Sequence, residues 1–250
     1  MSITEAFSSA NLPRAQVLLA WPLKQAMGSM ALMSAGVDED ARALQNIATK
    51  ARVARNETIF SQGDSPACAY KVVSGVVRVC KHMSDGRRHV LRFAFPGDFF
   101  GVMEFAHHSF TAEAVTDVVL MSYPQTRLSA LCDERATVSR RFATILSQKA
   151  CDMQNHLAVL GRQSAKERVA SFLLYLVEHM GCEEEDLIDA PMSRNDIADY
   201  LGLTNETVCR VLSELKRERV IESPNAHQFI LLNADSLHAL AEGEQYLAAA

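Results

Sequence analysis

The chain has 250 residues, 48% of them hydrophobic and 22% charged, with a formal net charge of −5 at pH 7. This length and apolar content are enough to build one large or two modest hydrophobic cores, so an intrinsically disordered chain is not expected. The acidic balance excludes a protein that coats nucleic acid through bulk positive charge, so any nucleic-acid binding must come from a local surface.

Residues 1–35 are predicted to be an N-terminal extension without a targeting signal. The apolar stretch Val17–Trp21 ends at Pro22 and Lys24, far short of the roughly 20 residues that a membrane-spanning helix needs. It also lacks the preceding basic segment of a secretory signal. We therefore expect a cytoplasmic protein with no membrane anchor.

Residues 36–125 are predicted to form a β-roll. Short β-type segments alternate with turn residues from Arg52 to about Met121, as in a compact antiparallel barrel or roll. Asp85-Gly86 favours a hairpin turn, because such turns need positive φ. The predicted strands are Thr58–Phe60, Tyr70–Val73, Val76–Cys80 and Val90–Phe95.

Residues 126–163 are predicted to contain one long helix for dimerisation. No Gly or Pro occurs between Ala136 and Gly161, and apolar residues recur there at steps of three and four. The apolar stripe is longer than one small roll can cover, which favours a dimer seam over a helix buried within one protomer. The residues assigned to this seam are Phe142, Ile145, Lys149, Met153, His156 and Leu160.

Residues 164–250 are predicted to form a winged helix-turn-helix domain, with its motif at Met192–Glu222. Ser193 and Asp196 have the spacing of an N-terminal capping box. Gly202 ends this first helix and Thr204 caps the second. A turn at Pro224-Asn225 between two apolar segments predicts a small β-wing, which makes the whole chain an α+β protein.

The second helix of this motif is predicted to bury one face and present the other to DNA. The positions spaced i, i+3, i+4 and i+7 are Val208, Val211, Leu212 and Leu215, which we assign to the core. The opposite face carries Glu206, Cys209 and Arg210. Arginine can donate two hydrogen bonds to guanine, and glutamate can accept one from cytosine N4. The alternative is a helical hairpin with a solvated outer face, and the wing and the long helix favour DNA binding over it.

The order of roll, long helix and winged helix-turn-helix resembles the CRP/FNR superfamily of bacterial transcription regulators, from about Gly36 onward. The matching motifs in the roll are Gly63-Asp64, Tyr70-x-Val-x-Ser-Gly75, Asp85-Gly86-Arg87 and Pro96-Gly97-Asp98-x-Phe-Gly101. The resemblance implies a cyclic-nucleotide-binding-type β-roll, a dimerisation helix and a DNA-binding domain. It also implies a homodimeric transcription activator that contacts double-stranded DNA and RNA polymerase, and not an enzyme.

Two departures from family patterns imply that this chain uses no cofactor. Members that bind cyclic AMP carry Glu after the last Gly of the roll and later an Arg-Ser or Arg-Thr pair, where this chain has Val102 and Phe110-Thr111. Without that arginine a cyclic phosphate would lose charge-assisted hydrogen bonds worth about 1.5–3 kcal/mol each. The six cysteines form no Cys-x-x-Cys pair and begin only at Cys68, so neither the iron–sulfur cluster of the FNR branch nor a metal is expected.

The segment Glu206-x-x-Cys209-Arg210 is most similar to the FixK branch. That branch reads TTGAT…ATCAA-like palindromes and controls low-oxygen respiration or nitrogen-fixation genes, generally without a small ligand. The resemblance implies base contacts from Glu206, Cys209 and Arg210. The residues that it implies as phosphate contacts are Ser193, Arg194, Asn195 and Thr204.

Two sharper hypotheses stay open beside this interpretation. Cys209 is a candidate redox switch, or simply a small residue that replaces serine. An alternative function is a CRP/FNR regulator whose roll binds a small effector or haem. Adjacent residues of a strand point to opposite faces, so His107-His108 cannot easily share one metal. The candidate haem or metal ligands are His82, His89, His107, His108 and His156.

Overall fold

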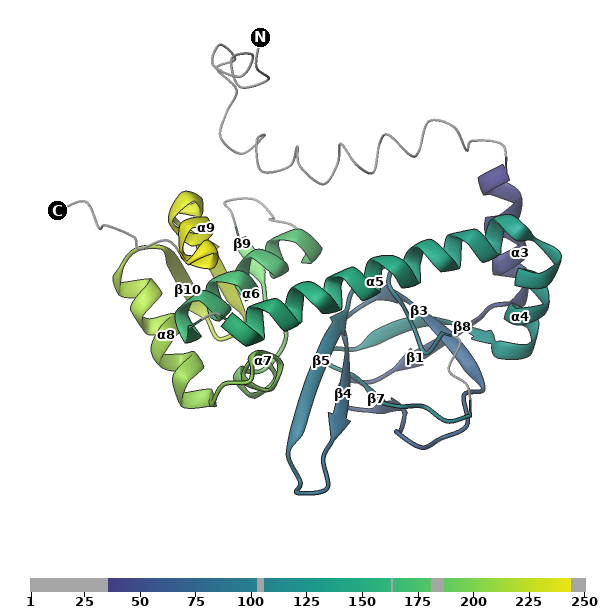
Figure 1. Ribbon diagram of the computed structural model, residues 1–250, viewed down its shortest axis with the longest axis horizontal. Helices are drawn as coiled ribbons and strands as arrows, with labels where there is room; N and C mark the ends of the chain where they lie inside the picture. Colours follow the sequence, from purple (N-terminus) through teal and green to yellow (C-terminus); the bar gives the residue numbers. More distant parts are fainter. Residues whose placement is uncertain (1–35, 103–105, 163, 181–186, 244–250) are drawn as a thin grey trace, which may run out of the picture. The chain divides into compact units, whose positions relative to one another are not determined.

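The computed structural model describes residues 36–102, 106–162, 164–180 and 187–243 (Figure 1). The predicted extension at 1–35 lies outside these residues. The chain divides into two compact units, Met1–Asn46 and Ile47–Ala250, and the described part of the first consists of residues 36–46 of helix α3 (Gly36–Ile47). Within the described ranges, none of the helices combines the length and the apolar character of a membrane span.

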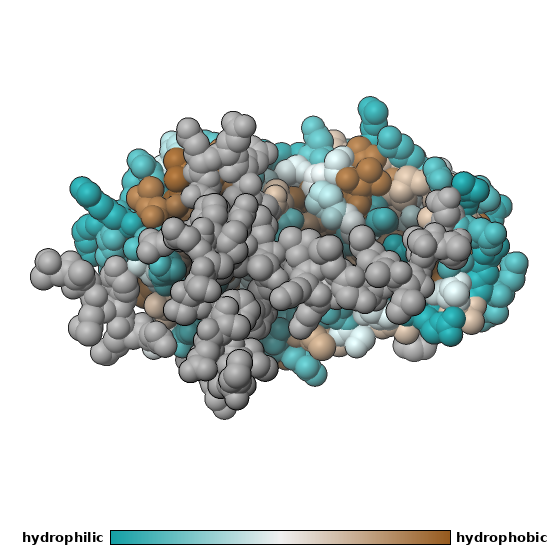
Figure 2. Space-filling view, turned by 90° about the horizontal axis from the view of Figure 1, so that it is seen from above, coloured by the Kyte–Doolittle hydropathy of each residue, from teal (hydrophilic) through white to brown (hydrophobic). Residues whose placement is uncertain are grey.

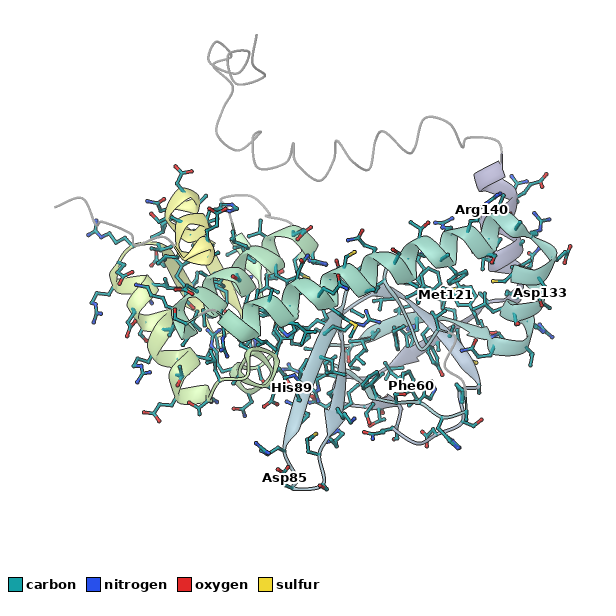
Figure 3. All side chains as sticks on the ribbon, in the orientation of Figure 1. Phe60, Asp85, His89, Met121, Asp133 and Arg140 are labelled. Carbon is teal, nitrogen blue, oxygen red and sulfur yellow. The ribbon has the colours of Figure 1, made fainter. Side chains whose placement is uncertain are left out.

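The second unit begins with the predicted β-roll, which consists of two antiparallel four-stranded sheets. Their strand orders are β1-β8-β3-β6 and β2-β7-β4-β5. The predicted hairpin joins β4 to β5, with Asp85 at its tip (Figure 3) and Gly86 at a φ of 84°. The strands are β1 (Thr49–Val53), β2 (Thr58–Phe60), β3 (Cys68–Ser74), β4 (Val77–His82), β5 (Arg88–Ala94), β6 (Phe99–Phe100), β7 (Thr111–Ala114) and β8 (Val118–Pro124).

Strand β4 has two faces with different tasks. Side chains alternate between the faces of a strand, and Val77 and Val79 pack in the interior of the roll. Arg78, Cys80 and His82 therefore share the outer face of the same strand. Cys80 is fully buried there, in the cluster that contains the core of the C-terminal domain. The second sheet of the roll thus presents polar side chains toward that domain.

Helix α4 (Gln125–Glu134) leads into α5 (Ala136–Arg162), which confirms the predicted long helix (Figure 1). One face of α5 packs on this chain's own roll, where the rings of Phe142 and Phe99 lie 5.1 Å apart and Lys149 Nζ lies 2.7 Å from Asp98 Oδ1. Further along the helix, the ring of His156 stacks on Tyr200 of the C-terminal domain with the ring centres 4.0 Å apart. Helix α5 therefore contacts both domains of the same protomer.

These contacts correct part of the predicted dimer seam. Phe142, Lys149 and His156 contact groups within this chain, so they do not form an open face for a partner. Met153 remains largely open to solvent, with an exposed fraction of 54%. The predicted seam combined residues from two faces of the helix. Residues with intrachain contacts and residues on the open face both recur at steps of three and four, so the spacing alone does not separate them.

The C-terminal domain contains the predicted helix-turn-helix and wing. Strands β10, β11 and β9 form a three-stranded sheet in that order, with β11 antiparallel to both neighbours. Buried side chains of α6 and of the helix-turn-helix share one core. The elements are α6 (Ala165–Met180), β9 (Leu187–Asp189), α7 (Arg194–Leu201), α8 (Asn205–Arg217), β10 (Ile221–Asn225), β11 (Gln228–Leu231) and α9 (Ala234–Glu242).

A cluster of ion pairs joins the roll to α7. Arg88 of β5 places Nη2 2.5 Å from Asp196 Oδ1 and 2.8 Å from Asp199 Oδ2. Arg78 of β4 places Nη1 3.4 Å from Asp196, and its Nε donates to Glu113 Oε2 at 2.7 Å. Burial disfavours the charged form of Arg88, but the hydrogen bond to Asp199 and the charge of Asp196 outweigh it, so the pKa of Arg88 is raised.

We call these five side chains, Arg78, Arg88, Glu113, Asp196 and Asp199, the roll–α7 ion cluster. The Asp196 side chain is only 4% exposed and that of Arg88 is 21% exposed. Removal of one partner from a buried pair leaves an uncompensated charge, which is much more costly than the loss of an exposed pair. The cluster therefore fixes how α7 meets the roll.

Replacement of Arg88 by methionine is expected to lower the free energy of unfolding by about 2–3 kcal/mol, because Asp196 would keep only Arg78 as a charged partner. The matched control is Arg87→Met. Arg87 is the preceding residue, and its pair with Asp85 is exposed to solvent at the hairpin tip. Urea unfolding of both variants measures the difference, and an equal loss in the two would contradict the assigned role of the cluster.

Candidate nucleic-acid interface

Helix α7 begins with the predicted capping box. The Ser193 hydroxyl accepts a hydrogen bond from the Asp196 N–H at 3.1 Å, and the Asp196 carboxylate accepts one from the Ser193 N–H at 3.1 Å. Two free N–H groups of the first turn are satisfied in this way. The helix ends at Gly202, whose φ of 63° is a conformation that glycine adopts without strain. Cap and stop together set the direction in which the chain enters the next helix.

Helix α8 begins at the predicted cap and buries the predicted face. Thr204 Oγ1 accepts a hydrogen bond from the Thr207 N–H at 3.2 Å. The side chains turned inward are Val208, Val211, Leu212 and Leu215, as the spacing predicted. Since the helix has only one buried face, the residues between these positions are held toward solvent.

The exposed face of α8 carries the side chains that were predicted to read bases. Glu206, Cys209 and Arg210 are all exposed, which confirms the predicted orientation, while their contact with bases stays a prediction. Lys216 and Arg217 add positive charge in the last turn. An acceptor, a thiol and a guanidinium within the first two turns form a short polar surface of a kind that the major groove admits.

A chain of polar contacts connects the two helices at this surface. The Cys209 thiol lies 3.2 Å from Asn205 Oδ1, and the Asn205 amide donates to Asn195 Oδ1 on α7. The Ser213 hydroxyl donates to the Cys209 carbonyl at 2.8 Å. Cys209 is therefore both exposed and held in place, and Asn195 and Asn205 form a polar bridge that sequence reasoning did not identify.

The four predicted phosphate contacts have different surroundings. The Ser193 hydroxyl donates to Asp196 Oδ2 at 2.7 Å, so in this conformation its proton is not available to a phosphate. Asn195 and Thr204 are exposed. The Arg194 guanidinium lies over the ring of Phe229 in the wing, 4.8 Å from the ring centre. Its phosphate role and those of Asn195 and Thr204 stay predictions.

The Arg194 guanidinium is partly buried. Its Nη1 atom is buried and has no hydrogen-bond partner among the residues that the structure describes. Burial disfavours the charged form, so the pKa of Arg194 is lowered, and the nearby Cys209 acts in the opposite direction. A negative group that approached this end of α7 could accept a hydrogen bond from the Arg194 Nη1 atom.

The Phe110-Thr111 pair of the roll, where the cyclic-AMP pattern has Arg-Ser or Arg-Thr, is engaged in contacts within the roll. Phe110, at the position where the cyclic-AMP pattern has arginine, packs against the roll core. The Thr111 hydroxyl is buried and accepts a hydrogen bond from the Gln62 N–H at 3.0 Å. Phe60 stacks on Tyr70, with the ring centres 5.8 Å apart. Phe110 and Thr111 thus supply a packing contact and a hydrogen bond, and neither supplies a cation for a phosphate.

The candidate haem or metal histidines are dispersed, and two of them are packed against rings. His108 is buried against Phe60 with the ring centres 3.7 Å apart. His156 is stacked on Tyr200, and burial lowers its pKa. His82 differs, because Cys80 and Glu113 lie beside it. Among the described residues, these three form a group whose potential ligand atoms all lie within 4.8 Å of one another.

The sequence matches two domain families in the order that the fold shows. Residues 50–135 match the family described as "Cyclic nucleotide-binding domain", and residues 167–240 match the "Crp-like helix-turn-helix domain". The first match covers the roll with α4, and the second covers the helices and wing of the C-terminal domain. Together they account for most of the described chain.

Relatives with assigned names align with most of this chain. The nitrogen fixation regulation protein FixK of Azorhizobium caulinodans is 35% identical over 246 residues, which cover 96% of this chain and 99% of that protein. The protein of the same name from Rhizobium meliloti is 40% identical over 182 residues, covering 73% and 82% of the two chains. The structure of FixK2 from Bradyrhizobium japonicum aligns with a TM-score of 0.74 at 35% identity and covers 78% of this chain and 97% of that one. This chain therefore belongs to the CRP/FNR superfamily of DNA-binding transcription regulators, in its FixK-like branch.

Proposed function

We propose that this protein binds a palindromic promoter site of the TTGAT…ATCAA type as a homodimer, with α8 of each protomer in the major groove. The observation that carries the proposal is the two-sided character of α8. Val208 and Val211 are buried, whereas Glu206, Cys209 and Arg210 are exposed on the opposite side. Arg210 would donate two hydrogen bonds to a guanine, and Glu206 would accept one from a cytosine N4 group.

Phosphate binding would come from groups around this face. Lys216 and Arg217 extend the basic character of α8, and Asn195 and Thr204 are exposed near the start of the two helices. The N-terminus of α8 adds the positive end of a helix dipole. These contacts would position the helix without reading sequence, which leaves specificity to Glu206, Cys209 and Arg210.

The open face of α5 supports a dimer. Exposed positions along the helix alternate at steps of four and three, which is the spacing of a coiled-coil seam. The exposed fractions are 41% for Leu146, 54% for Met153 and 65% for Leu157. Hydrophobic patches also interrupt the hydrophilic surface in Figure 2. We define the α5 seam as Ser139, Ala143, Leu146, Ala150, Met153, Leu157 and Leu160.

A homodimer across the α5 seam would place two α8 helices on one duplex. A two-fold axis between the protomers makes the two halves of the DNA site inverted repeats, about one helical turn apart. Two bound half-sites also supply more affinity than one domain alone. The seam and the recognition face therefore support the same proposal from different helices.

The biological role follows by analogy with the relatives. The relatives that are 35% and 40% identical are named nitrogen fixation regulation proteins. We propose that this protein likewise controls nitrogen-fixation or low-oxygen respiration genes through contact with RNA polymerase. Regulation would not require a cyclic nucleotide, since Phe110 replaces the phosphate-binding cation in the roll. Activity would instead be regulated through the amount of protein or through oxidation of Cys209.

Replacement of Arg210 by methionine is expected to weaken binding to a TTGAT…ATCAA duplex by about 1–3 kcal/mol per half-site, or roughly 5- to 150-fold, because the guanine contact is lost. Binding to a scrambled duplex should change much less. Lys216→Met is the matched control and should weaken both duplexes alike, with a shallower salt dependence. Gel-shift titrations at several salt concentrations measure this, and an equal loss on both duplexes for Arg210→Met would contradict base reading.

Replacement of Leu157 by glutamate is expected to convert the dimer to a monomer at micromolar concentration, because two buried carboxylates would face each other across the seam. The control is Gln154→Glu, which adds the same charge to an exposed position outside the seam. Sedimentation velocity gives the assembly state, and circular dichroism checks the fold. A Leu157→Glu protein that stays dimeric would show that the seam lies elsewhere.

Peroxide treatment is expected to reduce DNA affinity about tenfold or more in the parent protein, because oxidation of the Cys209 sulfur adds bulk and then negative charge beside the phosphates. Cys209→Ser should keep its affinity. Cys151→Ser, which removes an exposed thiol on α5, should respond like the parent. Fluorescence anisotropy with labelled duplex reports the change, and an equal loss for Cys209→Ser would remove the redox switch from the proposal.

A further inference from the structure

The outer face of the second roll sheet gathers three groups that can bind a metal. Cys80 and His82 are two residues apart on β4, so both point to the same face of the strand. Glu113 lies on the neighbouring strand β7, where it pairs in register with Arg78. Strand pairing thus brings together residues that are 31 or more positions apart in sequence.

The distances suit one tetrahedral ion. Cys80 Sγ lies 3.7 Å from His82 Nε2, and His82 Nε2 lies 3.6 Å from Glu113 Oε1. All the ligand atoms are within 4.8 Å of one another. Zinc bonds of about 2.0–2.3 Å at tetrahedral angles place ligand atoms about 3.3–3.6 Å apart. Only small side-chain adjustments are needed for all three to reach one ion.

Neighbouring groups already orient one of these ligands. Arg78 Nε donates to Glu113 Oε2 at 2.7 Å, which leaves Oε1 directed toward His82. Such outer hydrogen bonds are a regular part of protein metal sites, since they fix the coordinating carboxylate. The His82 side chain is 50% exposed and that of Glu113 is 15% exposed, so the group opens to solvent on the histidine side.

The charges around the group leave room for a cation. With a neutral Cys80 thiol, the roll–α7 ion cluster has three carboxylates (Glu113, Asp196 and Asp199) and two guanidinium groups, an excess of one negative charge. A divalent ion with a Cys80 thiolate adds two positive charges and one negative charge. The sum is then zero, so the ion and the thiolate together cancel the excess negative charge of this half-buried cluster.

We propose that Cys80, His82 and Glu113 bind one zinc-type divalent ion, with water in the fourth position. A thiolate, an imidazole and a carboxylate are ligands that zinc accepts, and three protein ligands leave one open position. On binding, the S–H bond of Cys80 breaks, its proton passes to solvent, and a sulfur–metal bond forms. This site revises the sequence-based expectation of no metal and adds Cys80 and Glu113 to the candidate ligand His82.

The site stands independently of the proposed function, because metal binding is measured without DNA. Full-length, reduced protein is stripped of metal with a chelator, which is then removed, and titrated with Zn²⁺ by calorimetry. We expect one ion per protomer. His82→Ala should weaken this binding about 100-fold or more through the loss of a ligand. His89→Ala is the matched control, because His89 lies on the facing strand of the same hairpin (Figure 3), outside the ligand group.

Co²⁺ used as a spectroscopic probe identifies the sulfur ligand. The parent and His89→Ala proteins should show the near-ultraviolet charge-transfer band of a cobalt–thiolate bond, and Cys80→Ala should not. His82→Ala changes an exposed side chain, so it tests the site even where Cys80→Ala fails to fold. The proposal is overturned when the parent binds no Zn²⁺, or when His82→Ala binds it as tightly as the parent. A cobalt–thiolate band that persists in Cys80→Ala would also overturn it.

Discussion

The carboxylate of Asp196 has two structural tasks, and the geometry of the C-terminal domain depends on both. One oxygen accepts hydrogen bonds from the hydroxyl and the N–H of Ser193, which starts helix α7. The carboxylate also pairs with Arg88 and Arg78 of the roll. A buried carboxylate is costly unless charged and polar partners surround it. The same carboxylate therefore caps the start of α7 and attaches the helix to the roll.

The position of α8 follows from this attachment. Helix α7 is short, and it ends at Gly202. Thr204 then caps the start of helix α8 only two residues later. The Asn195–Asn205 contact then links the exposed ends of the two helices. These contacts connect the roll, through α7, to the helix face that carries Glu206 and Arg210. Helix α5 supplies the second constraint, since one side packs within the protomer and an adjacent side offers the α5 seam.

Local patterns explain what could be predicted from the sequence. The capping box at Ser193, the stop at Gly202 and the buried face of α8 all depend on residues within a few positions of one another, so a single sequence shows them. The strands of the roll and the Asp85-Gly86 hairpin were predictable for the same reason. Exposure of Glu206, Cys209 and Arg210 followed once the buried face was assigned.

Contacts between distant segments explain what was missed. Arg88 and Asp196 are 108 positions apart, and Arg78 and Glu113 are 35 apart, so no local pattern connects them. The face of α5 was misassigned because Lys149 and His156 fit an apolar stripe while they bind Asp98 and Tyr200. A strict alternation of four and three from Ser139 to Leu160, with alanine admitted as a seam residue, would have identified the open face.

The roll–α7 ion cluster also limits how modular this architecture is. A C-terminal fragment that begins at α6 would keep Asp196 and Asp199 but lose both arginines that neutralise them. A chimera that joins this DNA-binding domain to a foreign roll would inherit the same deficit unless the graft includes the β4–β5 hairpin. The natural unit of exchange is thus the hairpin and the helix-turn-helix together, although they are distant in sequence and belong to different domains.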